Sequence, residues 1–163
     1  MGLDAVAFRQ ATLTDEHERT DACRGDDHVL AHVIDDDFHR SLRGLTAGRC
    51  YKVADRAIRV SSSYSGHGQF REVLARVFYD KAPRDIWNDP EAYADRPFFE
   101  LIQFADNEGT IGPLAAADLA RDFTEGREQW DAALDVSEWE RRKYDEWTEA
   151  FEAAANDGLV RFA

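Results

Sequence analysis

The sequence lacks both a long hydrophobic run and a basic leader. No stretch approaches the roughly 20 apolar residues that a membrane-spanning helix needs. The opening Met1-Gly2-Leu3-Asp4 carries no basic residue, and Asp4 interrupts the apolar residues around it, so a secretory signal peptide is not indicated. We therefore expect a cytoplasmic protein that has no membrane partner.

Cysteine is scarce, and the motifs of several enzyme classes are absent. Cys23 and Cys50 form no CxxC pair and have no histidine at a recognisable catalytic spacing, which favours two ordinary reduced thiols. The chain also lacks G-x-S-x-G and the G-x-x-x-x-G-K-[ST] pattern of a nucleotide-binding P-loop. These absences argue against the common serine hydrolases and exclude a P-loop nucleotidase.

Lysine is rare as well, and the chain is strongly acidic. Only Lys52, Lys81 and Lys143 are lysines among the 20 basic residues, while 33 acidic residues give a net charge of −13. Such a surface repels phosphates, so we expect no direct nucleic-acid binding. Three explanations of the acidity remain open: adaptation to a salty cytosol, the composition of a GC-rich genome, and imitation of a nucleic acid.

The hydrophobic pattern predicts a single α+β domain over residues 1–163, built on a small, mostly antiparallel sheet. Runs rich in β-branched and aromatic residues predict strands at 3–8, 50–60 and 159–162. We expect the two terminal strands to pair, which would tie both ends of the chain into one sheet.

Three to four helices should pack against this sheet. Apolar residues recur at helical spacing over 70–77 and 98–105, and Pro113 suits the first position of a further helix. Ser137 and Glu140 form the capping-box signature of the last one. Residues 80–97 contain three of the four prolines and predict an irregular insertion or a lid-like loop.

Three stretches resemble a family of uncharacterised small bacterial and phage proteins. They are the N-terminal MGLD, the SYSG sequence at residues 63–66, and the FELIQFADNEGTIGP sequence at residues 99–113. The similarity runs over most of the chain, with residues 80–96 as the variable insertion. The resemblance implies no activity, because the family has no assigned function. This chain has His67-Gly68 where the family carries Tyr-Asn, which speaks against a catalytic role for His67.

The polar stretch Ser61–Gly68 is the first predicted ligand site. It leads from a strand into a helix, and backbone N–H groups at a helix start, flanked by hydroxyls and small residues, can bind an anion. The predicted ligand-binding residues here are Ser63, Tyr64, Ser65, Gly66 and His67. The alternative is purely structural, with Ser65 capping the helix and the glycines permitting a tight turn.

The second predicted site is the loop Asp106–Gly112, where Asn107 is a further ligand-binding candidate. Asp106 and Glu108 offer oxygen ligands of the kind that Mg²⁺ and Ca²⁺ prefer. The alternating spacing of a calcium loop is missing, so no cofactor is predicted and a Mg²⁺ or Ca²⁺ ion is only the alternative. The loop can equally be a simple corner between helices.

Glu100 lies within a strongly apolar helix, where a carboxylate must be paired, hydrogen-bonded or raised in pKa. With Asp106 or Glu108 it could form an acid/base pair, and an arginine partner in a structural ion pair is the alternative.

The leading functional hypothesis is a non-enzymatic domain that binds a small ligand or a protein in a cleft between residues 61–68 and 106–112. The second is a metal-assisted or acid/base hydrolase using Glu100, Asp106 or Glu108, with residues 80–97 as its lid. The third is an acidic mimic of nucleic acid, as a phage or anti-defence accessory protein could be.

Overall fold

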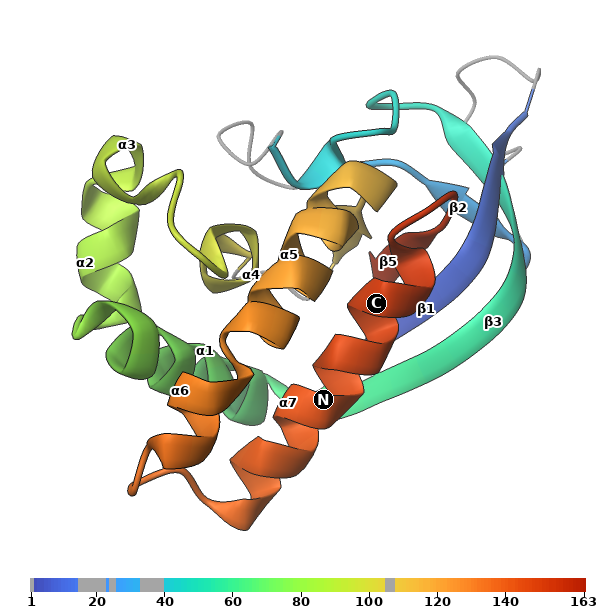
Figure 1. The fold of residues 1–163 in the computed structure, drawn as a ribbon. Coiled ribbons are helices and arrows are strands. Elements are labelled where there is room, and N and C mark those ends of the chain that lie inside the picture. The colour runs from blue at the N-terminus through green and yellow to red at the C-terminus, as the bar shows by residue number, and fades with distance from the viewer. Residues whose placement is uncertain (1, 15–22, 24–25, 33–39, 105–107) are drawn as a thin grey trace.

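A five-stranded antiparallel sheet forms the centre of the computed structural model, which describes residues 2–14, 23, 26–32, 40–104 and 108–163 (Figure 1). The strand order is β2-β3-β1-β5-β4, and each neighbouring pair runs antiparallel. The strands are β1 (Gly2–Leu13), β2 (His28–Leu30), β3 (Cys50–Ser63), β4 (Gly109–Ile111) and β5 (Leu159–Phe162). The predicted pairing of the terminal strands is confirmed, because Ala5 of β1 lies opposite Phe162 of β5.

The first strand is longer than its apolar sequence indicates. We expected it to end near residue 8, but β1 continues to Leu13, which lies opposite Tyr51 of β3. Pairing with the long strand β3 supplies backbone hydrogen bonds to the polar residues 9–13, which hydrophobicity alone does not predict.

In the described residues three long helices and four short ones accompany the sheet, which confirms the α+β class. The helices are α1 (Tyr64–Tyr79), α2 (Pro83–Asn88), α3 (Pro90–Tyr93), α4 (Phe99–Gln103), α5 (Pro113–Glu125), α6 (Arg127–Ala132) and α7 (Glu138–Ala154). Both predicted helix starts are confirmed. Pro113 is the first residue of α5, and Ser137 caps α7 in a capping box with Glu140.

The main core lies between the sheet and the helices. Leu3, Ala5 and Ala7 of β1 face this side, and α7 runs across the sheet with α5 packed beside it (Figure 1). Trp130 and Trp147 are both fully buried in it, and the partly buried Trp139 packs against it. The alternate β1 residues Val6 and Phe8 face the other way, into a smaller cluster. Because both faces of β1 are covered there, its sequence shows little polar alternation.

Residues 80–97 are not the irregular insertion that their prolines predict, because they contain the short helices α2 and α3. Proline stands at the first position of both helices, where its fixed φ is favourable and its missing N–H costs nothing. The Trp87 indole N–H donates to the Ile102 carbonyl (3.1 Å), and Tyr79 donates to the Pro97 carbonyl (2.7 Å). These bonds hold the segment against α4 and α1.

The two cysteines are not the reduced pair that we predicted, because Cys23 and Cys50 form a disulfide. Their Cα atoms are 5.7 Å apart, which is ordinary for a disulfide. The pairing arises because β2 folds back on β3, with Leu30 opposite Cys50, and a separation of 27 residues gives no sequence motif. The cysteines therefore no longer support the expectation of a reducing, cytoplasmic location.

Membrane insertion finds no support in the helices: within the described residues, none combines the length and the apolar character that a bilayer span requires.

Added salt should stabilise the fold. The excess of acidic residues repels itself, and screening weakens this repulsion. Screening also weakens exposed ion pairs such as Arg76–Asp135 and Arg127–Asp145, but such pairs contribute only about 0–1 kcal/mol each. We expect the melting temperature to rise by at least about 3 °C between 50 mM and 1 M KCl, measured by calorimetry. A melting temperature that stays constant or falls would contradict this.

Candidate functional site

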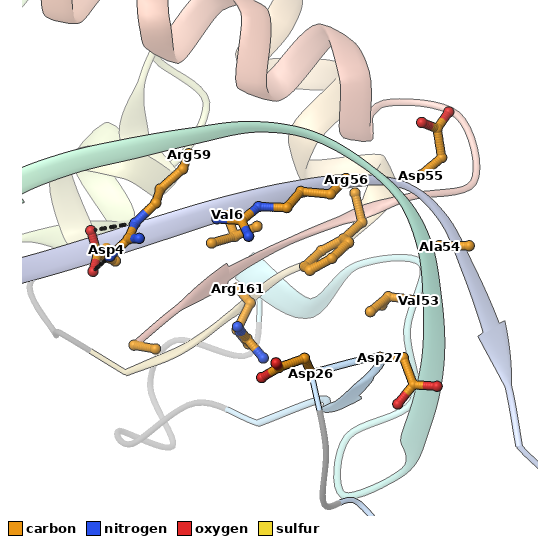
Figure 2. Close-up of a pocket in the computed structure, with 12 residues that line it drawn as sticks. Asp4, Val6, Asp26, Asp27, Val53, Ala54, Asp55, Arg56, Arg59 and Arg161 are labelled. Carbon is orange, nitrogen blue, oxygen red and sulfur yellow. Dashed lines mark hydrogen bonds and ion pairs between the residues drawn. The ribbon is translucent and has the colours of Figure 1, made fainter.

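A pocket of about 530 Å³ opens on the face of the sheet opposite the helices (Figure 2). Its volume falls within the range of roughly 300–1,000 Å³ that is typical of small-molecule sites. The lining residues come from β1, β3 and β5, and from the segment just before β2. Val6, Phe8 and Val53 form its apolar part, next to the smaller hydrophobic cluster.

A β-bulge places two arginines on the wall of this pocket. The pairing of β3 with β1 shifts by one residue at Ala57, so that Arg56 lies opposite Phe8 and Arg59 lies opposite Val6. On a regular strand, residues three apart point to opposite faces. Since Phe8 and Val6 share one face of β1, the extra residue brings both arginines to the pocket side.

The bend beside the bulge is made by Asp55, a non-glycine residue with a φ of 53°. Aspartate tolerates this left-handed conformation better than most residues, because its short side chain can bond locally. Here the carboxylate accepts a hydrogen bond from Arg9 of β1 (3.2 Å), which holds the bend against the neighbouring strand. The strand predicted at residues 50–60 is continuous through Asp55 and extends to Ser63.

A third arginine, Arg161, enters the pocket from β5. Its guanidinium lies over the Phe8 ring, 5.9 Å from the centroid. The Arg161 Nε atom is buried and has no hydrogen-bond partner among the described residues. In Figure 2 the guanidinium points toward the side of the pocket where Asp26 stands.

The other charges of the pocket are mostly paired within the protein. Asp4 accepts hydrogen bonds from Arg59 Nε (2.9 Å) and from the Ser61 hydroxyl (2.7 Å). These bonds, with Arg59 first, lower the pKa of Asp4 to about 2. Asp27 contacts His28 Nδ1 at 2.9 Å, and this bond lowers the pKa of Asp27.

Three charged side chains of the pocket remain without such partners. The side chains of Arg56, Arg161 and Asp26 form no hydrogen bond or ion pair with any residue that the structure describes. Sequence reasoning missed all three. The sequence carries a signal only for Arg56: Asp55 interrupts the strand just before Arg56 and Arg59, and this pattern reveals a shared face of the two arginines only once the bulge is known.

The residues of the first predicted site form a helix start and not a loop. β3 continues to Ser63 and α1 begins at Tyr64, so the predicted polar loop at 61–68 is wrong. The cap is Ser63, whose hydroxyl accepts from the Gly66 N–H (3.0 Å), and not Ser65 as the structural alternative had it. Ser65 instead shares a hydrogen bond with the Ser63 hydroxyl (3.0 Å).

Two residues of this predicted site, Gly66 and His67, are tightly packed against their neighbours. A Cβ on Gly66 would lie 2.5 Å from the Ser62 hydroxyl oxygen, so a larger residue does not fit. His67 is only 4% exposed, and its ring lies near those of Trp147 and Phe162. Burial first, and the Arg71 charge second, lower the pKa of His67 to about 3.

The second predicted site is only partly described. Asp106 and Asn107 lie outside the described residues, and the exposed Glu108 directly precedes β4. The expected loop over 106–112 is therefore wrong for Gly109–Ile111, which pair with β5.

The two predicted segments belong to strands that are not neighbours in the sheet. β3 and β4 are separated by β1 and β5, and three strand spacings amount to about 14 Å. The rings of Phe104 and Phe162 are in contact at 4.3 Å between centroids, and His67 Nε2 lies 3.3 Å from the Phe104 carbonyl oxygen. Among the described residues, the contacts near these two segments are therefore made by buried side chains.

Glu100 has the arginine partners that the structural alternative requires. It is 7% exposed, and its Oε1 atom lies 3.0 Å from Arg43 Nη2 and 3.6 Å from Arg40 Nη2. Burial raises the pKa of Glu100, and the two arginines oppose this effect. The same Arg43 nitrogen lies 2.7 Å from Asp118 of α5, so the group links three segments of the chain.

The described residues contain no cluster of three or more His, Cys, Asp or Glu side chains that could hold a metal ion. In comparisons with protein-family models, with curated proteins and with solved structures, nothing matched this chain.

Proposed function

We propose that the protein is a small-ligand-binding domain whose site is the pocket on the face of the sheet opposite the helices, and that Arg56 and Arg161 hold an anionic group of the ligand. The observation that carries this proposal is that the two guanidinium groups lack ion-pair partners. Neither has an ion-pair partner among the described residues, although the chain contains 33 acidic residues. Guanidinium groups bind carboxylates and phosphates through strong, charge-assisted hydrogen bonds.

The composition of the pocket supports binding over catalysis. The described lining residues include no serine, threonine, cysteine, histidine or lysine, so hydroxyl, thiol, imidazole and amine nucleophiles are lacking there. Two of its carboxylates, those of Asp4 and Asp27, have a lowered pKa. A carboxylate of low pKa is a weak proton acceptor near neutral pH, whereas the pKa of a carboxylate that acts as a general base is raised toward the working pH.

The proposal keeps the binding role expected from the sequence, but it places the ligand in the sheet pocket and not between residues 61–68 and 106–112. The pairing of Glu100 with Arg43 and Arg40 favours a structural role for that carboxylate over the hydrolase hypothesis.

Binding of a simple probe tests this function. We expect 3-phenylpropanoate, which joins a carboxylate to an apolar ring, to bind the wild-type protein in an NMR titration. Arg161→Met should weaken this binding by at least about tenfold, because a hydrogen bond to a charged group contributes roughly 1.5–3 kcal/mol.

Arg84→Met is the matched control. Arg84 lies exposed on α2, away from the pocket, so its loss changes the net charge equally and should leave the affinity unchanged. Equal binding of 3-phenylpropanoate to both variants would overturn the proposal.

A further inference from the structure

The pocket offers a free carboxylate beside its free guanidinium groups. Asp26 lines the same pocket as Arg56 and Arg161, and it forms no hydrogen bond or ion pair with any described residue. Figure 2 shows its carboxylate on the side toward which Arg161 points. The site therefore presents both signs of charge next to an apolar surface.

The chain is attached to β3 at two described residues near Asp26. Three residues earlier, Cys23 is bonded to Cys50 at the start of β3. One residue later, the Asp27 carbonyl accepts a hydrogen bond from the Val53 N–H (2.8 Å). The second attachment holds Asp27, the residue next to Asp26, against β3.

We infer that the ligand of this pocket is a zwitterion of the amino-acid type. Its anionic group binds Arg56 and Arg161, its ammonium group binds Asp26, and its apolar part lies on Val6 and Phe8. This inference rests on the proposed function and specifies the ligand class for the same site. An ammonium group supplies three hydrogen-bond donors, which a free carboxylate accepts well.

The charge of the whole protein favours the same ligand class. A net charge of −13 repels a simple anion from a distance, and Asp26 repels it again inside the pocket. A zwitterion has no net charge, so it avoids the long-range repulsion and satisfies charges of both signs on arrival. An amine without an anionic group would leave Arg56 and Arg161 unpaired and would meet their repulsion.

Three matched probes test the inference by NMR titration at pH 7. L-phenylalanine carries both charges, 3-phenylpropanoate lacks the amine, and 2-phenylethylamine lacks the carboxylate. We expect L-phenylalanine to bind the wild type about tenfold more tightly than 3-phenylpropanoate. 2-Phenylethylamine should bind most weakly of the three.

Asp26→Asn should remove the advantage of L-phenylalanine and leave the affinity for 3-phenylpropanoate equal or higher. Asp95→Asn, an exposed aspartate outside the pocket, is the control of equal charge change and should leave all three affinities unchanged. If 3-phenylpropanoate binds through Arg161 but the amine adds nothing, the zwitterion inference fails and the proposed function stands. If neither acid binds, both fail.

Discussion

Between pH 7 and pH 4 the wild-type protein should lose roughly 3 kcal/mol more unfolding free energy than a variant that lacks His67. Burial lowers the pKa of His67 from its ordinary value of 6.5 to about 3. At any pH between these two values the unfolded chain binds a proton at this position that the folded protein does not. Stability is therefore complete above pH 6.5, falls as the pH falls through the window, and reaches its limit below about pH 3.

The variant His67→Gln suits this measurement because glutamine keeps an N–H donor that can reach the Phe104 carbonyl. Urea unfolding at pH 7, 5.5 and 4 gives the free-energy difference at each pH. The variant is expected to be less stable at pH 7, because it packs less well against Trp147, and to approach or overtake the wild type at pH 4.

The comparison must be made between variant and wild type at each pH, because Asp122 acts in the opposite direction. Burial raises the pKa of Asp122 to about 6, so this carboxylate adds stability as the pH falls from 6 toward its ordinary value of 3.8. His32→Gln, at a partly exposed histidine, is the control for the loss of one imidazole from the chain. A constant difference between His67→Gln and the wild type across pH would contradict a neutral buried histidine.

Local sequence signals predicted the starts of α5 and α7. The capping pair Ser137 and Glu140 acts within one helical turn, and Pro113 acts through its own fixed φ. The pairing of the terminal strands was also predictable, because each is a short apolar run at an end of the chain and both are buried in the same sheet.

The candidate site depends on features that local patterns do not contain. Arg56 and Arg59 share a face only because β3 has an extra residue relative to β1, and a bulge is a property of the pair of strands. The disulfide likewise requires β2 to fold back on β3, which brings together residues 27 positions apart. The sequence-based sites instead followed polar residues such as Ser63, whose hydroxyl is used to start a helix.

Removal of the Arg43 side chain is expected to destabilise the protein by about 2–3 kcal/mol at pH 7. Arg43 lies 3.0 Å from the buried Glu100 and 2.7 Å from Asp118, and without it Glu100 keeps only the more distant Arg40. Breaking a buried ion pair typically costs roughly 3–5 kcal/mol, and the partial exposure of Arg43 reduces this figure. Urea unfolding of Arg43→Met measures the loss.

Two further variants separate the buried pair from ordinary surface charge. Arg121→Met removes the other arginine on Asp118, at 2.7 Å, but Arg121 is 58% exposed and its loss should cost less than about 1 kcal/mol. The double variant Arg43→Met/Glu100→Gln should recover more than half of the loss, because it leaves no uncompensated charge inside the protein.

The pH dependence of the stability loss in Arg43→Met also tests whether Arg43 compensates the charge of Glu100. Burial already raises the pKa of Glu100, and losing Arg43 raises it further, so the folded variant binds a proton more readily than its unfolded chain. The deficit of Arg43→Met should therefore shrink as the pH falls toward 4. Equal and small losses of unfolding free energy in Arg43→Met and Arg121→Met would show that the charge of Glu100 does not depend on Arg43. Such a result would favour the acid/base role for Glu100 again.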